Sequence, residues 1–234
     1  MSFWRGLLFA TGLLGWIVPA ASAPVAAKFE DTIAQRAKAC TLCHGKEGRA
    51  AADGYYPRLA GKPAGYLYKQ LLNFRDGRRD YGLMSELIAP LSDAYLQELA
   101  GYFSQLSLPY APAQPPGLPA EALNTGKQLV LHGDPARKLP ACVQCHGQAL
   151  AGVQPFIPGL LGLPRDYLNG QLGAWRSGQR RAVAPDCMAQ IAKQLQPAEI
   201  NAISHWLAAQ DPPSGLKPAP SLPAPLPLDC GGLQ

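Results

Sequence analysis

The sequence predicts an all-α protein built from two similar domains in tandem. Two segments carry the same residues in the same order, hydrophobic residues within each recur at three-to-four-residue spacing, and a proline-rich stretch separates the two. Of the 234 residues, 47% are hydrophobic and 16% charged, which supports two small cores and excludes a disordered or coiled-coil chain. The net charge of +5 includes no run of more than two basic residues, so the sequence does not predict nucleic-acid binding.

Residues 1–23 have the composition of an export signal. Arg5 is followed by the uncharged stretch 6–27, and residues 21–23 (Ala-Ser-Ala) have the small-x-small pattern of a signal-peptidase site. We expect cleavage after Ala23, which places the remaining chain in the periplasm, an oxidising compartment. An uncleaved anchor is the alternative, because 22 uncharged residues are just enough to span a bilayer.

The repeated segments each begin with a Cys-x-x-Cys-His-Gly motif, at residues 40–45 and 142–147. After each motif follow a proline, an aromatic residue, a glutamine, an aromatic–arginine pair and a methionine. The matching pairs are Pro57 and Pro158, Tyr66 and Tyr167, Gln70 and Gln171, Phe74 and Trp175, Arg75 and Arg176, and Met84 and Met188. An order kept over this length indicates a tandem duplication.

Proline-rich stretches mark the boundaries of the repeats. Residues 109–119 hold five prolines in eleven positions, which favours an extended, semi-rigid linker over a helix or central strand. Residues 211–234 form a similar tail. The predicted domains are therefore 24–108 and 120–210, and each contains one copy of the repeat.

Helices are expected wherever apolar residues follow the helical period. In the first domain these stretches are 29–39, 64–74 and 91–106, and in the second they are 121–132, 165–175 and 196–209. Ser92 or Asp93 is the expected N-cap of the third helix, and Gln196-Pro197 opens its counterpart. No alternating pattern of useful length predicts a strand.

A Cys-x-x-Cys-His motif in an exported protein is the attachment signature of haem c. Two thiols bond to the porphyrin and the adjoining histidine binds the iron. We expect thioether bonds at Cys40, Cys43, Cys142 and Cys145, and axial ligation by His44 and His146. The alternatives fit less well: a zinc site needs Cys pairs about 15–20 residues apart, a thioredoxin-like site needs a βαβ unit, and a disulfide leaves the histidine unexplained.

The second axial ligands are predicted to be methionines. Besides Met1, the chain has only Met84 and Met188, which follow His44 and His146 by 40 and 42 residues. Methionine opposite histidine fills both axial positions and raises the reduction potential, whereas the alternative is a core-filling role. His132 and His205 have no counterpart in the other repeat, so we expect them at the surface or in packing contacts.

The mature chain up to about residue 210 resembles the dihaem cytochrome c4 family. The residues that carry the resemblance are the two haem motifs, residues 57–61 (PRLAG), residues 66–79 (YLYKQLLNFRDGRR), Met84 and Leu91-Ser92-Asp93. The resemblance implies two class I cytochrome c folds related by pseudo-twofold symmetry, with the haem propionates facing each other. It also implies a periplasmic electron carrier between a quinol–cytochrome c reductase and a terminal oxidase.

The resemblance also suggests roles for residues near the haems. The carbonyls of Pro57 and Pro158 are expected to accept the ring N–H of the axial histidines. Some arginines are expected to neutralise the propionates, with solvated surface charge as the alternative: Arg58, Arg75, Arg79, Arg176 and Arg180. The repeated aromatic residues are expected to pack on haem or helices: Tyr66, Phe74, Tyr167 and Trp175.

Two cysteines lie outside the haem motifs. Cys187 directly precedes Met188, and Cys230 lies in the proline-rich tail. In an oxidising compartment we expect them to form a disulfide that fastens the tail to the loop bearing Met188. Two unpaired thiols are the alternative.

The sequence therefore predicts a periplasmic electron-transfer protein with two covalently bound haem c groups and no enzymatic activity. Its partners would be a redox donor and acceptor, and membrane contact would be peripheral or through an uncleaved N-terminus. One alternative is the dedicated electron-accepting subunit of a periplasmic dehydrogenase. The other is a dihaem peroxidase, which needs an openable iron site and is disfavoured by a methionine in both repeats.

Overall fold

The first domain consists of short helices joined by loops. The computed structural model describes residues 30–50 and 54–233, so the expected signal segment lies outside the described residues. The helices are α1 (Ile33–Arg36), α2 (Lys38–His44), α3 (Ala64–Arg75), α4 (Gly82–Ile88) and α5 (Asp93–Gln105), with a 3-10 turn at Lys46–Gly48. The expectations for α3 and α5 are confirmed, including Ser92 as the N-cap, whose hydroxyl accepts a hydrogen bond from the Tyr95 amide at 3.3 Å.

The expected first helix, 29–39, was wrong at both ends. It begins at Ile33 because the Thr32 hydroxyl accepts a hydrogen bond from the Gln35 amide at 3.2 Å and so caps it. After a break at Ala37 the chain forms α2, which continues through the Cys-x-x-Cys-His motif. It ends at Gly45, whose φ of 73° is open to glycine and costly for other residues.

The second domain repeats this plan with a small hairpin added. Its helices are α6 (Ala120–Leu131), α7 (Cys142–His146), α8 (Arg165–Ser177), α9 (Cys187–Gln194) and α10 (Pro197–Ala208). The hairpin pairs β1 (Gly152–Val153) with β2 (Ile157–Pro158) in antiparallel register. Short 3-10 turns lie at Pro135–Arg137 and Gly231–Leu233. The sequence did not predict the hairpin because two-residue strands are too short to show an alternating pattern.

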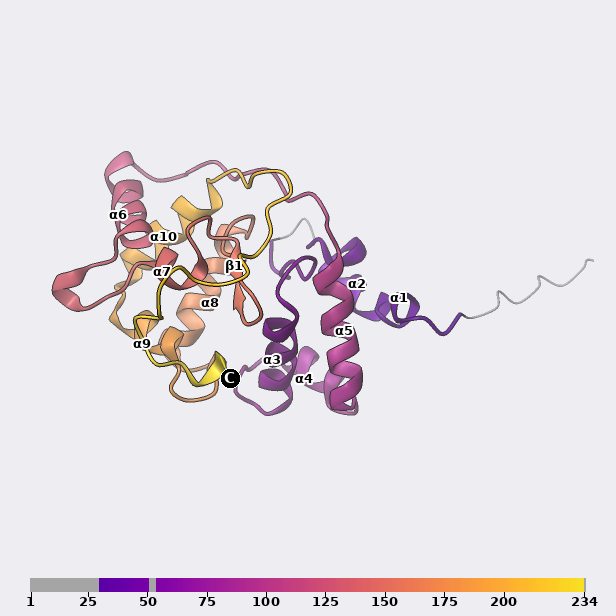
Figure 1. The fold of residues 1–234 in the computed structure, drawn as a ribbon. Coiled ribbons are helices and arrows are strands. Elements are labelled where there is room, and N and C mark those ends of the chain that lie inside the picture. The colour runs from indigo at the N-terminus through magenta and orange to yellow at the C-terminus, as the bar shows by residue number, and fades with distance from the viewer. Residues whose placement is uncertain (1–29, 51–53, 234) are drawn as a thin grey trace, which may run out of the picture. The chain divides into compact units, whose positions relative to one another are not determined.

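Each domain has its own apolar core. In the second domain α6 crosses α10 so closely that a Cβ at Gly126 would overlap the Ala202 carbonyl. Val130, Ile203 and Leu207 are buried at this crossing. In the first domain Leu99 and Phe103 of α5 pack with Leu67 of α3. Figure 1 shows α1–α5 gathered in one lobe and α6–α10 with the hairpin in another.

The linker lies against the folded chain. The Gln114 amide donates to the Ala208 carbonyl at 2.8 Å, and the His205 ring hydrogen-bonds the Pro116 carbonyl, so His205 is a packing residue. Residues Asp31–Gln234 form one compact unit. Within the described ranges, no helix has the length and apolar character required to cross a bilayer.

Candidate haem sites

The first candidate site is a large cavity in the first domain. Helix α2 brings Cys40, Cys43 and His44 to its wall, and α4 brings Met84 to it. The cavity has a volume of about 700 Å³, which is within the range of cofactor pockets. The two cysteines are not joined to each other in a disulfide, so both thiols are available to bond to a porphyrin.

Both motif histidines are held in the same way. The His44 Nδ1 lies 2.8 Å from the Pro57 carbonyl oxygen, and the His146 Nδ1 lies 2.8 Å from the Pro158 carbonyl oxygen. Each histidine is 8% exposed, and burial lowers the pKa of both, partly offset by the bond to the proline. A neutral ring that donates from Nδ1 keeps its other nitrogen for a metal.

The second site brings together the equivalent residues. Helix α7 carries Cys142, Cys145 and His146, and Met188 is the second residue of α9. Burial raises the pKa of the Cys142 thiol to about 12. Asp186 caps α9: its carboxylate accepts hydrogen bonds from the backbone amides of Ala182 at 2.7 Å and Ala189 at 3.1 Å, and so folds the loop that leads to Met188.

Two arginines meet between the domains in a nearly symmetric arrangement. Arg79 and Arg180 pair through an antiparallel backbone bridge. Arg79 donates to Gln70 at 3.0 Å, Gln171 at 2.7 Å and the Tyr167 hydroxyl at 3.2 Å. Arg180 donates to the same glutamines at 2.9 and 2.7 Å and to the Tyr66 hydroxyl at 3.3 Å. The repeated tyrosines therefore have a polar role that packing alone did not predict.

This cluster has an excess of positive charge. No ion pair joins Arg79, Arg180 or Lys62 to a carboxylate among the described residues. Burial lowers the pKa of Lys62 to about 8. Burial alone would raise the pKa of Tyr167, but the three neighbouring cations turn the net shift downward. A group of buried cations of this kind favours an anion nearby.

An unpaired donor points to the same chemistry. The buried indole Nε1 of Trp175 has no hydrogen-bond partner within the described chain, and the Arg180 guanidinium stacks on that ring at 3.7 Å. Arg79 stacks equivalently on Phe74 at 4.5 Å. Haem propionates are anions that accept hydrogen bonds, so the residues present fit the propionate edge of haem c.

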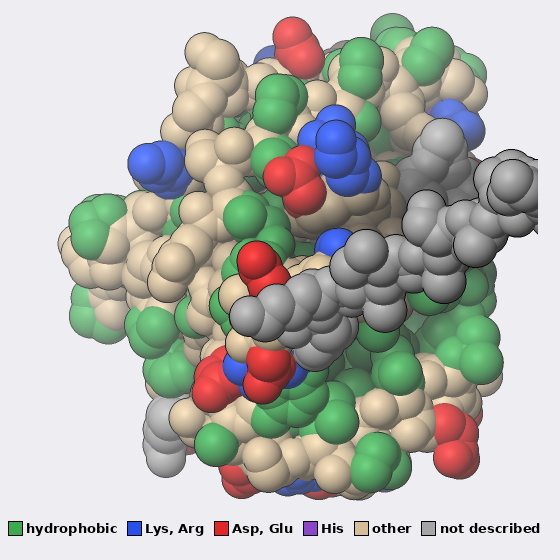
Figure 2. Space-filling model, turned by 90° about the vertical axis from the view of Figure 1, so that its right-hand side faces the viewer, with side chains coloured by type: hydrophobic (Ala, Val, Ile, Leu, Met, Phe, Trp, Pro, Cys, Tyr) green, Lys and Arg blue, Asp and Glu red, His purple; other side chains and the backbone are tan. Residues whose placement is uncertain are grey.

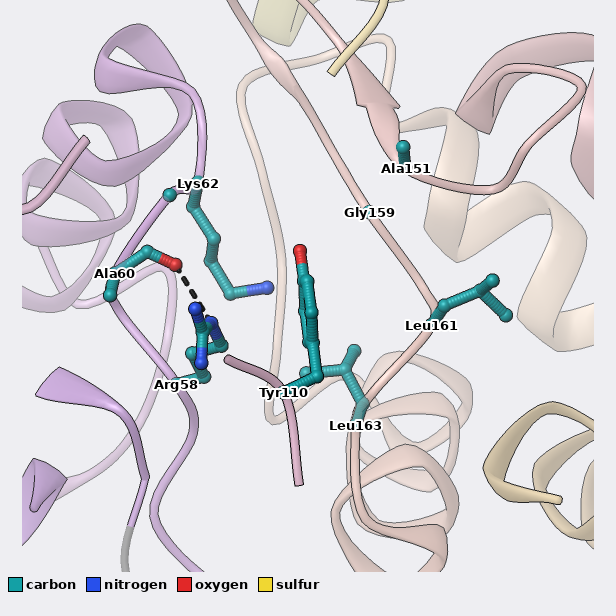
Figure 3. Close-up of a pocket in the computed structure, with 9 residues that line it drawn as sticks. Arg58, Ala60, Lys62, Tyr110, Ala151, Gly159, Leu161 and Leu163 are labelled. Atoms are coloured by element: carbon teal, nitrogen blue, oxygen red, sulfur yellow. Dashed lines mark hydrogen bonds between the residues drawn. The ribbon is translucent and has the colours of Figure 1, made fainter. Parts of the chain in front are cut away.

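The other three arginines have partners of their own. Arg58 donates to the carbonyls of Ala60, Leu108 and Pro109 at 3.0, 2.5 and 2.8 Å, and Figure 3 shows it beside the Tyr110 ring, 4.3 Å away. Arg58 therefore anchors the linker.

Arg75 and Arg176 are also engaged elsewhere. Arg75 pairs with Asp93 at 2.7 Å, and Arg176 donates to the carbonyls of Lys193 and Leu195. Of the five candidates, only Arg79 and Arg180 lie in the interdomain cluster.

The sequence interpretation missed Lys62 and the role of the two glutamines. Gln70 and Gln171 did carry a signal, because a polar residue is repeated within an apolar helical pattern. Lys62 carried none, since Leu163 occupies its place in the second repeat.

Exposed hydrophobic side chains are prominent around the first site. Leu42 lies between the two haem-motif cysteines and Leu83 directly precedes Met84; both are exposed, as are Tyr55 and Leu87. Figure 2 views one face of the molecule, on which hydrophobic side chains form several adjacent groups. In the second domain, Cys187 occupies the place of Leu83 and is joined to Cys230 in a disulfide with Cα atoms 5.4 Å apart.

Comparison with known proteins identifies the family. No family model matches the chain. It is 38% identical over 209 residues to the "Thiosulfate dehydrogenase electron acceptor" of Thiomonas intermedia, covering 88% of this chain and 91% of the relative. It is 34% identical over 181 residues to the cytochrome c4 of Pseudomonas aeruginosa, covering 76% and 87%. The chain belongs to the dihaem cytochrome c4 family.

Solved structures support this cytochrome c4 assignment. Reduced recombinant cytochrome c4 from Pseudomonas stutzeri superposes with a TM-score of 0.66 at 28% identity, covering 76% of this chain and 96% of that one. Thiosulfate dehydrogenase (TsdBA) from Marichromatium purpuratum gives a TM-score of 0.65 at 33% identity, covering 73% of this chain but only 36% of that longer chain. The protein is thus an electron-transfer cytochrome with two tandem cytochrome c domains and two covalently bound haems.

Proposed function

We propose that this cytochrome is the periplasmic electron acceptor of a dehydrogenase that oxidises thiosulfate. The observation that carries the proposal is the pattern of identity. Two relatives named as thiosulfate dehydrogenase electron acceptors, from Thiomonas intermedia and Stutzerimonas stutzeri, are each 38% identical to this chain. The cytochromes c4 compared with it are 31–34% identical.

Our proposal assigns one haem to each domain. The haem of the first domain (24–108) is bonded to Cys40 and Cys43. The haem of the second domain (120–210) is bonded to Cys142 and Cys145. Residues 109–119 are the linker and 211–234 the tail. The proposed axial pairs are His44 with Met84 and His146 with Met188.

Haem c supplies a one-electron Fe(II)/Fe(III) couple when bound. The chain's own residues hold the ligand geometry constant: Pro57 and Pro158 orient the histidines through their carbonyls, and the two methionines fill the remaining axial positions. With both positions filled, no substrate binds the metal, and the protein acts as a carrier and not as an enzyme. Arg79, Arg180 and Lys62 hold the propionate charge between the domains.

Stopped-flow spectroscopy tests the partner. The oxidised holoprotein is mixed with a thiosulfate dehydrogenase and thiosulfate, and haem reduction is followed by absorbance. We expect both haems to be reduced, at least about tenfold faster than an equal concentration of Pseudomonas aeruginosa cytochrome c4. Equal rates for the two proteins would refute the assignment. Faster reduction by a quinol–cytochrome c reductase would instead favour a general respiratory carrier.

Two further measurements test the remaining parts of the proposal. Peroxide turnover by the purified protein would restore the dihaem peroxidase alternative, and we expect none. The N-terminus of protein recovered from the periplasm is expected at Pro24, as determined by mass spectrometry. An intact N-terminus would indicate a membrane anchor.

A further inference from the structure

The C-terminal tail, residues 211–233, touches the second domain on both sides of its candidate haem site. In Figure 1 the tail, drawn in yellow, runs from the end of α10 past β1 and toward the region of α9. Its backbone meets the hairpin next to the histidine side, and its last turn meets the loop that carries Met188. The two contacts are separate in the sequence, at Ala219 and at residues 230–231.

On the histidine side, the tail extends the hairpin. The Ala219 amide donates to the Gly152 carbonyl at 2.9 Å, and the Gln154 amide donates to the Ala219 carbonyl at 2.8 Å. Gly152 is paired in register with Pro158 on β2. The carbonyl of Pro158 is the hydrogen-bond partner of His146. The tail therefore braces the strand that orients the histidine.

On the methionine side, the tail is fastened covalently. Cys230 is bonded to Cys187, which directly precedes Met188. The Gly231 amide donates to the Pro185 carbonyl at 3.0 Å. Gly231 lies so close to this loop that a Cβ there would overlap the Ala184 carbonyl. The loop is thus held by one disulfide and one close backbone contact.

The first domain provides an internal comparison. Leu83 stands where the second repeat has Cys187, and its side chain is 67% exposed. Residues of the linker, not a strap, follow the last helix of that domain. The same fold therefore holds Met84 without a covalent fastening next to it.

We propose that the tail is a strap that positions both axial ligands of the second haem, and that a dithiol reductant releases it. The dithiol transfers two electrons and two protons to the Cys187–Cys230 bond, giving two cysteine thiols, and itself becomes a disulfide. The loop bearing Met188 then loses its covalent attachment, and the second axial position opens to external ligands. This inference rests on the proposed ligand pair His146 and Met188, and not on the identity of the redox partner.

Carbon monoxide binding to the ferrous holoprotein tests the strap, because CO binds only where the methionine has left the iron. Protein reduced with ascorbate, which leaves disulfides intact, is compared with protein reduced anaerobically with dithiothreitol, and thiols are counted in both. We expect no CO binding with ascorbate and binding at one of the two haems with dithiothreitol. The strap is refuted if the thiols appear without CO binding, or if both haems bind equally.

Variants test the same inference without a reductant. With ascorbate alone, the double variant Cys187→Ser/Cys230→Ser is expected to bind CO at one haem at least about tenfold faster than wild type. The matched control is Lys217→Ala, an exposed tail residue, with no expected change. If the double variant does not fold, Gly231→Ala keeps both cysteines but displaces the last turn, and the same effect is expected.

The ferric spectrum separates failure of the strap from failure of the ligand assignment. Two methionine-ligated haems give a charge-transfer band at about 695 nm with the amplitude of two sites. A wild-type band with the amplitude of one site refutes the ligand pair itself. A full band, together with CO binding that is insensitive to the disulfide, refutes the strap alone.

Discussion

Replacing Gly65 with alanine is expected to weaken the contact between the two domains. Gly65 lies at the start of α3, and a Cβ there would be 2.5 Å from the Phe156 ring and 2.7 Å from the Pro155 carbonyl oxygen. Both atoms belong to the hairpin loop of the second domain. The neighbouring Tyr66 amide donates to that same carbonyl at 3.1 Å. An added methyl group therefore forces α3 and the loop apart and stretches this hydrogen bond.

The expected cost follows from the kind of atoms that are crowded. A backbone carbonyl cannot turn aside as a flexible side chain can, so the loop itself must move. Overpacking of this kind costs about 1–3 kcal/mol, and little helix propensity offsets it, because Gly65 is only the second residue of α3. The cation–π contact of Lys69 with Phe156, now at 4.2 Å, is expected to lengthen as well.

Urea unfolding and amide hydrogen exchange measure this effect. The matched control is Gly101→Ala within α5, where a new Cβ would meet nothing within 4 Å and where alanine is expected to add up to about 1 kcal/mol of stability. In Gly65→Ala, we expect lower stability and faster exchange of the Tyr66 amide. Unfolding free energies equal within about 0.5 kcal/mol and unchanged Tyr66 protection would refute the reasoning.

The other predictions concern charge and ligation. Arg180→Gln removes a buried cation and is expected to lower a haem reduction potential by about 40 mV, roughly 1 kcal/mol for one electron, whereas Arg176→Gln leaves both potentials unchanged in a spectroelectrochemical titration. Glu199→Gln breaks an ion pair and is expected to cost about 1 kcal/mol at pH 7. The pKa of Glu199 is lowered from 4.5, so this difference should disappear as the pH falls through its folded pKa in acid unfolding. Met84→Ala and Met188→Ala are each expected to let cyanide bind one ferric haem, and cyanide binding at neither would contradict the ligand assignment.

Much of the fold could be predicted because long periodic segments carry a strong signal. Helix α3 was expected at 64–74 and spans Ala64–Arg75, and α10 was expected at 196–209 and spans Pro197–Ala208. The methionine-bearing helices α4 and α9 were not expected. They have seven and eight residues, about two turns, which is too short for the helical period to stand out from its flanks.

The candidate site was predictable where chemistry needs a fixed residue type at a fixed spacing. Thiols, imidazole and thioether each have few substitutes, so the motif residues and the two methionines could be named from the chain alone. The choice among the five arginines could not be made. Arg58 and Arg180 are equally buried, at 4% exposure, but Arg58 is turned toward linker carbonyls and Arg180 toward the other domain. Only the packing of the two domains distinguishes these surroundings.

The strap shows why the two copies of a duplicated fold diverge where they do. Both domains use the same local devices, such as the glycine that ends each motif helix at φ 73° and 81° and the proline carbonyl that orients each histidine. Chain continues beyond the last helix of both domains, but only after the second does it return to its own methionine loop. The Cys187–Cys230 pair could be inferred from the compartment, since few residue types form a covalent bond. The pairing of Ala219 with Gly152 could not, because it uses backbone atoms that every residue has. A device that acts on one haem of two can therefore arise from a tail whose composition alone resembles a linker.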